Sequence, residues 1–163
     1  MTSLTIGNKA PAFEGDCTGG GTANLLNLKG KRVVLYFYPK DNTPGCTKEG
    51  QNFRDLYKQF VKENTLIFGL SRESIESHEK FKKEQSFPFD LISDPDEKIC
   101  EQYEVIKEKS MYGRKYMGIE RSTFLIDEDG KLVKEWRKVK VKEHAMQVLE
   151  AVRAMNENSL RDF

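Results

Sequence analysis

An unbroken apolar run from Val33 to Tyr38 constrains the fold of this chain more than any other segment. The run is rich in β-branched and aromatic residues. It lacks the alternation of apolar and polar residues that marks a strand with one solvent-exposed face. Such a run is typical of a central strand that is buried on both faces of its sheet. Pro39 ends the strand, because proline has no N–H group to donate to a neighbouring strand. The run therefore predicts a sheet that other elements cover on both faces.

The segments that follow alternate between helical and strand periods. From Thr47 to about Lys62, apolar residues recur at spacings of three and four, which indicates an amphipathic helix. A second buried strand is predicted at Leu66–Leu70. The short connections of this strand, helix, strand unit favour a parallel, right-handed crossover.

The same alternation continues to the end of the chain, and no linker divides it. We therefore predict one domain over residues 1–163, with a parallel core that is extended by an antiparallel hairpin. The tract Gly19–Gly21 is expected to form a flexible hairpin tip. The remaining predicted elements are a helix capped by Ser74 that reaches about Gln85, a strand at Phe89–Ile92, a helix from Pro95 to Tyr103, strands at Ser122–Ile126 and Leu132–Trp136, and a helix from about Val141 to Asn156.

Composition excludes several classes of function. The 27 Lys and Arg residues nearly balance the 26 Asp and Glu residues, so binding to nucleic acid by bulk charge is not expected. The sequence has no leader pattern and no apolar run of roughly 20 residues, so we expect a cytoplasmic protein that does not enter a membrane. Neither histidine has a ligand-spaced partner, so we expect no metal and no cofactor, and we expect His78 and His144 to lie on solvated helix faces.

The loop between the first predicted strand and helix carries the clearest chemical signal. Its prolines and Gly45 constrain the backbone and place Cys46 in the first turn of the helix. Unpaired N–H groups and the helix dipole stabilise an anion there, and the thiolate is the reactive form of cysteine. Open α/β sheets also bind ligands at the carboxyl ends of their strands. Cys46 is therefore a candidate nucleophile, and the alternative is a small apolar residue packed beneath the helix.

This segment resembles the active-site signature of the peroxiredoxins. Pro39, Thr43 and Cys46 match the pattern P-x-x-x-T-x-x-C, and Arg121 lies in a segment similar to the one that supplies the catalytic arginine of the family. From Gly7 to the last helix, the order of segments resembles the bacterioferritin comigratory protein or peroxiredoxin Q subfamily. The resemblance implies a thioredoxin-like fold, a central mixed β-sheet with helices on both faces and an N-terminal β-hairpin.

The resemblance also implies roles for these residues. The Cys46 thiolate would attack hydrogen peroxide or an organic hydroperoxide, leaving a cysteine sulfenic acid and releasing water or an alcohol. The Thr43 hydroxyl and the Arg121 guanidinium would stabilise the transition state, and Pro39 would shield the pocket from water. Taken singly, a threonine in a turn, a surface arginine and a strand-ending proline need no function, but their spacing here favours the catalytic roles.

One part of the family pattern is missing. Many members of the subfamily carry a resolving cysteine five residues after the reactive one, where this chain has Gln51, and others carry it in the next helix, which has none here. Cys100 is a possible resolving residue or a packing residue, and Cys17 near the glycine tract is a further candidate. The leading hypothesis is a one-cysteine mode in which thioredoxin, glutaredoxin or a small thiol reduces Cys46.

The expected function is therefore a thiol-dependent peroxidase of antioxidant defence, acting as a monomer or weak dimer. A disulfide oxidoreductase of the thioredoxin type is disfavoured, because it requires C-x-x-C and no second cysteine follows Cys46 at that spacing. The alternative function is a redox-sensing or chaperone-like protein that uses the oxidised state of Cys46 as a switch.

Overall fold

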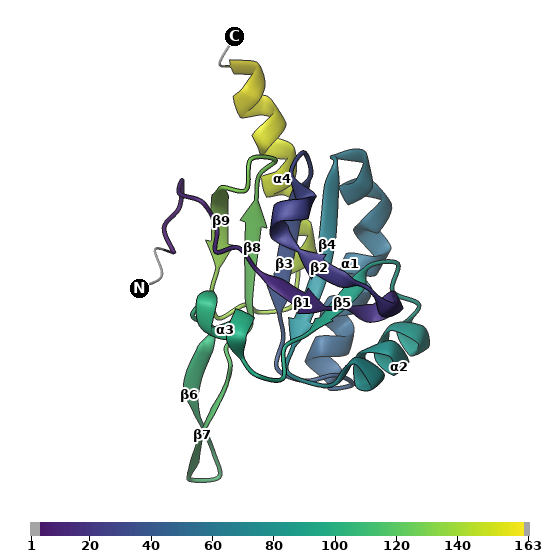
Figure 1. Ribbon diagram of the computed structural model, residues 1–163, viewed down its shortest axis with the longest axis vertical. Helices are drawn as coiled ribbons and strands as arrows, with labels where there is room; N and C mark the ends of the chain where they lie inside the picture. The colour runs from purple at the N-terminus through teal and green to yellow at the C-terminus, as the bar shows by residue number, and fades with distance from the viewer. Residues whose placement is uncertain (1–3, 162–163) are drawn as a thin grey trace.

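The computed structural model describes residues 4–161, and its centre is a mixed five-stranded sheet (Figure 1). The strand order is β5-β4-β3-β8-β9. Strand β3 pairs in parallel with β4 and antiparallel with β8, so it occupies the predicted central position. The sheet strands are β3 (Arg32–Phe37), β4 (Thr65–Ser71), β5 (Asp90–Ser93), β8 (Ser122–Ile126) and β9 (Leu132–Trp136).

The two faces of β3 enter two separate cores, as the unbroken apolar run predicts. Val34, Tyr36 and Tyr38 pack against α1 (Pro44–Lys62), α2 (Ile75–Gln85) and α4 (His144–Arg161). Val33, Leu35 and Phe37 pack against α3 (Lys98–Gln102) and the N-terminal hairpin of β1 (Glu14–Asp16) and β2 (Thr22–Asn24). In Figure 1 this hairpin lies across the front of the sheet. The thioredoxin-like α/β class is confirmed.

Local backbone geometry explains where predicted helix ends differ from observed ones. Helix α1 begins at Pro44, ahead of the predicted Thr47, because proline suits the first helical position. Helix α3 is shorter than the predicted helix, since Glu97 adopts a left-handed conformation (φ 61°) immediately before it. Helix α4 starts at His144 for the same reason, because Glu143 has a φ of 62°. The Ser74 cap is confirmed, since its Oγ accepts a hydrogen bond from the N–H of Ser77 at 3.2 Å.

The predicted flexible tip at Gly19–Gly21 is tied to the body of the protein. A 3-10 turn covers Thr18–Gly20. The buried Thr18 hydroxyl donates to Asp90 at 2.8 Å, and the Gly19 N–H donates to Glu79 at 2.6 Å. These bonds fasten the N-terminal hairpin to β5 and α2.

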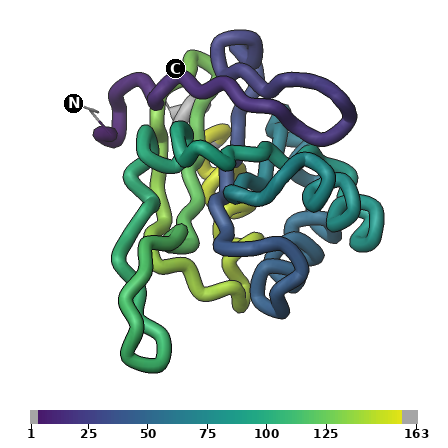
Figure 2. The backbone as a smooth tube through the Cα atoms, turned by 60° about the horizontal axis from the view of Figure 1, so that its bottom comes forward, coloured from purple at the N-terminus to yellow at the C-terminus, as the bar shows by residue number. Residues whose placement is uncertain are grey.

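A second hairpin was absent from the sequence prediction. Strands β6 (Ile106–Met111) and β7 (Arg114–Ile119) form a separate two-stranded sheet that projects from the body (Figures 1 and 2). Tyr112 and Gly113 connect them with φ values of 53° and 79°. Two left-handed residues in a two-residue loop give the twist that a tight hairpin needs.

In the part of the chain that the structure describes, no helix combines the length and the apolar character that a membrane span requires.

Candidate active site

Cys46 is the third residue of α1 and is 2% exposed. The first backbone bond of this helix runs from the N–H of Thr47 to the carbonyl oxygen of Thr43 at 2.9 Å. The N–H groups of Gly45 and Cys46 therefore belong to the positive end of the helix dipole. This placement at the carboxyl end of β3 agrees with the sequence prediction.

Arg121 lies beside the thiol, as predicted. Its Nη2 donates to Cys46 Sγ at 3.3 Å, and its Nη1 donates to Glu49 Oε1 at 2.6 Å. A Cβ atom at position 45 would lie 3.2 Å from Arg121 Nη2, so Gly45 permits this close approach. One guanidinium thus contacts both the thiol and a carboxyl group, so a positive charge lies beside the sulfur of Cys46.

Glu49 is a site residue that sequence reasoning missed. Its side chain is buried, one helical turn after Cys46, and Oε2 has no hydrogen-bond partner among the described residues. Burial raises the pKa of Glu49 to about 7, although the charge of Arg121 opposes this shift. Burial alone would lower the pKa of Arg121, but Glu49 and Cys46 hold it above its usual value. The spacing of three from Cys46 was the available signal, because it puts both residues on one helix face.

The Glu49→Gln variant should alter how stability depends on pH. The unfolded chain releases the Glu49 proton near pH 4.5, and the folded protein holds it up to about pH 7. Wild type should therefore lose about 2 to 3 kcal/mol of unfolding free energy between pH 5 and pH 8 that the glutamine variant retains. Urea unfolding of both proteins at both pH values measures this difference. The other titrating groups contribute equally to both proteins, so their contributions cancel when the two pH dependences are subtracted. Identical pH dependence in the two proteins would contradict the assignment.

Thr43 and Pro39 lie on the loop that leads into α1. Thr43 occupies the N-cap position three residues before Cys46, but its hydroxyl donates to the carbonyl of Lys40 at 2.8 Å and makes no capping bond to the helix. This bond uses the hydroxyl proton, while the oxygen keeps lone pairs that can accept a hydrogen bond. Pro39 is half-buried, two residues after the end of β3.

A buried network holds the same loop in place. Asp41 accepts hydrogen bonds from Tyr38 at 2.6 Å and Ser77 at 2.7 Å, and its Oδ2 lies 2.7 Å from His78 Nδ1. His78 Nε2 lies 3.0 Å from the carbonyl oxygen of Ile92 and must carry a proton there, because a carbonyl only accepts. Burial opposes ionisation of Asp41, but its bonds from His78 and Tyr38 lower its pKa overall. The network joins the active-site loop to α2 and β5.

Both histidines contradict the predicted solvated positions. His78 and His144 are 0% and 2% exposed. His78 lies with Phe81 on the buried side of α2, and its ring forms a hydrogen bond with Asp41. His144 Nε2 lies 2.7 Å from the Thr123 hydroxyl, and burial, aided by the charge of Arg121, lowers its pKa to about 4. Tertiary partners therefore compensate for burial in both cases.

Asp41, Glu73 and His78 bring potential metal ligands within 4.8 Å of one another. Their atoms are already engaged, because Glu73 Oε1 accepts from the Asp41 N–H at 2.8 Å and from Ser71 at 2.7 Å. This pattern is typical of a structural hydrogen-bond network.

The other two cysteines lie in the core on the opposite face of the central sheet. Cys46 belongs to the cluster beneath α1, whereas Cys17 and Cys100 belong to the cluster beneath α3 and the N-terminal hairpin. Cys100 is 0% exposed, and its pKa is raised by burial and by Asp94. The pKa of Cys17 is also raised, by burial and then by the charge of Asp90. The sheet therefore separates both thiols from Cys46.

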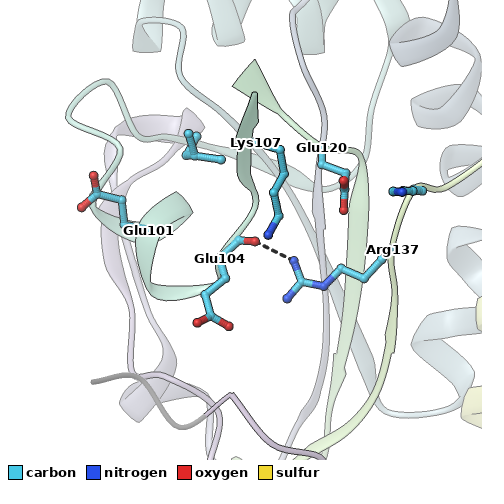
Figure 3. Close-up of a pocket in the computed structure, with 7 residues that line it drawn as sticks. Glu101, Glu104, Lys107, Glu120 and Arg137 are labelled. Carbon is cyan, nitrogen blue, oxygen red and sulfur yellow. Dashed lines mark hydrogen bonds between the residues drawn. The ribbon is translucent and has the colours of Figure 1, made fainter. Parts of the chain in front are cut away.

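A cavity of about 810 Å³ lies at the base of the β6–β7 hairpin, and Cys46 is not among its lining residues (Figure 3). Arg137 Nη1 donates to the carbonyl of Glu104 at 2.8 Å, and Nη2 donates to that of Tyr103 at 3.1 Å. The cavity is lined by three acidic and three basic residues, so the lining favours neither an anion nor a cation. The lining residues are Glu101, Glu104, Ile106, Lys107, Glu120, Arg137 and Lys138.

A thioredoxin-like fold with a buried cysteine at a helix N-terminus, paired with an arginine, defines the class of thiol-dependent oxidoreductases. The chain belongs to the AhpC/TSA family, whose sequence pattern matches residues 6–135. It is 49% identical over 155 residues to the peroxiredoxin Bcp of Bacillus subtilis, which covers 95% of this chain and 99% of the relative. It is 50% identical over 156 residues to the peroxiredoxin Bcp of Xanthomonas campestris pv. campestris, and this alignment covers 94% of this chain and 98% of the relative.

Solved structures similar to this chain belong to the same group of proteins. Xanthomonas campestris peroxiredoxin Q superposes with a TM-score of 0.84 at 48% identity, covering 87% of this chain and 90% of the other. A cysteine-to-serine mutant of Xylella fastidiosa PrxQ gives a TM-score of 0.89 at 41% identity, and the superposition covers 96% of this chain and 99% of the other. The chain is thus a peroxidase of the peroxiredoxin type, which reduces peroxides at the expense of thiols.

Proposed function

We propose that Cys46 is the peroxidatic nucleophile and that it passes through a sulfenic acid in each turnover. The observation that carries this proposal is the 3.3 Å contact of Arg121 Nη2 with Cys46 Sγ at the N-terminus of α1. Two sources of positive potential meet at one buried sulfur, which is the setting expected of a nucleophilic cysteine. Family membership favours catalytic turnover over a redox-sensing or chaperone-like role.

The chemical step needs one protein nucleophile and one proton. The Cys46 thiolate attacks the terminal oxygen of the hydroperoxide, and the O–O bond breaks as the S–O bond forms. The terminal oxygen keeps its hydrogen and becomes the sulfenic acid, while the other oxygen leaves as hydroxide or alkoxide and takes a proton from water. Arg121 stabilises the charge that develops on the oxygens, and the Thr43 oxygen accepts a hydrogen bond from the hydroperoxide O–H. Pro39 limits access of water to this position.

The substrates we propose are hydrogen peroxide and organic hydroperoxides. The bacterioferritin comigratory protein of Xanthomonas campestris, 48% identical to this chain, is described as having alkyl peroxide reduction activity. The reaction would serve antioxidant defence in the cytoplasm, where thiol pools are kept reduced.

An external thiol completes the cycle in this proposal. It attacks the sulfenic acid, releases water and leaves a mixed disulfide on Cys46, and a second thiol then frees the enzyme. The position of Cys17 and Cys100 across the central sheet supports this one-cysteine mode. Thioredoxin, glutaredoxin and small thiols are the candidate reductants.

Mass spectrometry after one equivalent of peroxide tests this cycle. We expect the peptide that contains Cys46 to gain one oxygen atom, trappable with dimedone, when no thiol is present. The matched variants Cys17→Ser and Cys100→Ser should keep turnover with dithiothreitol within about twofold of wild type. A disulfide between Cys46 and Cys100, together with lost turnover in Cys100→Ser, would overturn the one-cysteine mode while leaving Cys46 as the nucleophile.

A further inference from the structure

The β6–β7 hairpin has two chemically different faces. Residues paired across the strands share a face, so the register places Lys107, Lys109, Met111, Arg114 and Tyr116 on one side. We call this set the basic face, because it carries three cations and no carboxylate. The opposite face carries Glu108 and Lys115, which form an ion pair at 3.6 Å, and Met117. The hairpin thus concentrates positive charge on one side of a chain whose net charge is only +1.

The basic face also exposes apolar surface. Met111 and Tyr116 are 57% and 42% exposed, and Tyr112 at the turn is 98% exposed. Apolar side chains between cations are typical of a surface that contacts a partner protein, where a fully solvated arm would carry polar residues. The hairpin projects from the body, so this surface is accessible (Figures 1 and 2).

The base of the basic face lies close to the active site. Strand β7 leads through Glu120 directly into Arg121. The half-buried Lys109 has a pKa lowered by burial and then by the charge of Arg121, while the charge of Cys46 acts against that shift. Arg72, which follows β4, donates to the carbonyl of Met117 at 3.3 Å and fixes the hairpin at the carboxyl edge of the sheet. A protein that contacts the basic face would therefore reach the neighbourhood of Cys46.

From this placement we infer that the basic face is the docking surface for an acidic dithiol protein that reduces oxidised Cys46. Its carboxylates would pair with Lys107, Lys109 and Arg114, and its apolar surface would cover Met111 and Tyr116. Opposite charge steers such a partner to the site and orients its thiol. A second copy of this chain does not fit, because a twofold contact through this face would place the three cations against their own copies. The inference rests on the proposed function, since it requires Cys46 to be oxidised in turnover.

Steady-state peroxidase kinetics test the inference with two reductants, a thioredoxin of net negative charge and dithiothreitol. Arg114→Glu should raise the KM for thioredoxin about tenfold. Lys115→Glu makes the same charge change on the opposite face of the same strand, and its KM should stay within about twofold of wild type. The variant Met111→Ser should also raise this KM. With dithiothreitol all variants should turn over at the wild-type rate, because a small thiol needs no docking surface.

The salt dependence provides a second readout. Added NaCl should raise the thioredoxin KM of wild type more steeply than that of Arg114→Glu, since screening removes the same attraction. Equal KM values for Arg114→Glu and Lys115→Glu would overturn the docking inference. Binding of wild type to phosphatidylglycerol vesicles that Arg114→Glu loses, with an unchanged thioredoxin KM, would instead assign the face to a lipid surface and overturn it as well. Failure of wild type to consume peroxide with dithiothreitol would contradict the proposed function, and this outcome is distinct from the other two.

Discussion

Replacing Cys46 with serine is expected to abolish peroxide consumption with either thioredoxin or dithiothreitol as the reductant. A serine hydroxyl is not ionised by one arginine and a helix N-terminus, and its oxygen is a far weaker nucleophile toward peroxide than a thiolate. We expect the rate to fall to the level of the reagents without enzyme, a loss of at least about 10³-fold. The measurement is the initial rate of peroxide loss at equal protein concentration.

Controls separate this result from misfolding and from the other thiols. The free energy of unfolding of Cys46→Ser, measured in urea, should lie within about 1 kcal/mol of the wild-type value, since serine is nearly isosteric with cysteine. Cys17→Ser and Cys100→Ser should retain turnover. Substantial peroxide consumption by a folded Cys46→Ser protein would show that another group carries the chemistry.

The second large effect is expected for Arg121. Its guanidinium reaches Cys46 through Nη2 and Glu49 through Nη1, so Arg121→Ala removes a charge-stabilising donor from the reacting sulfur. Loss of one such donor costs about 10² to 10³-fold in rate. Stopped-flow measurement of Cys46 oxidation by hydrogen peroxide gives the second-order rate constant directly. Arg121→Lys should recover only part of the rate, because one ammonium group does not replace a planar fork that contacts two partners.

Truncation of Arg121 also leaves the buried Glu49 carboxyl without its cation, and this lowers stability. The double variant Arg121→Ala with Glu49→Gln removes the buried ionisable carboxyl, so at neutral pH it should regain stability without regaining rate. Arg54→Ala in α1 is the control arginine variant, because Arg54 bonds Asp55 and the carbonyl of Gln85 instead of Cys46 or Glu49. A wild-type rate in a folded Arg121→Ala protein would contradict the role of Arg121.

The sequence predicted those parts of the fold that local patterns encode. The unbroken run at Val33–Tyr38 predicted a central strand, and β8 and β9 have the predicted bounds because a strong turn signal separates them. Strands β6 and β7 were missed, since alternating Lys107, Glu108 and Lys109 lack the apolar face by which strands are recognised. Their pairing depends on the tight turn and on contacts with the body, such as the bond from Arg72.

The candidate site was also predicted only where local motifs encode it. The loop motif and Arg121 were predicted from the resemblance, and the structure brings Arg121 to Cys46. Glu49 was missed and the prediction of a solvated His78 was wrong, because a charged or titratable residue is expected in solvent unless its partner is known. Those partners, Arg121 and Asp41, lie 72 and 37 positions away in the chain, and only the folded structure reveals them. The role of the residues around Cys46 remains a prediction for the variants above to test.

The separation of the three cysteines by the central sheet has a consequence for how long the oxidised enzyme persists. In the proposed one-cysteine cycle, Cys17 and Cys100 lie across the sheet from Cys46, so the sulfenic acid would persist until an external thiol reacts with it, and its lifetime would lengthen as the reductant pool is depleted. A second peroxide molecule would then have time to convert the sulfenic acid to a sulfinic acid, a step that is irreversible outside the 2-Cys peroxiredoxins. The extent of inactivation during peroxide exposure should therefore report the supply of reducing equivalents in the cell.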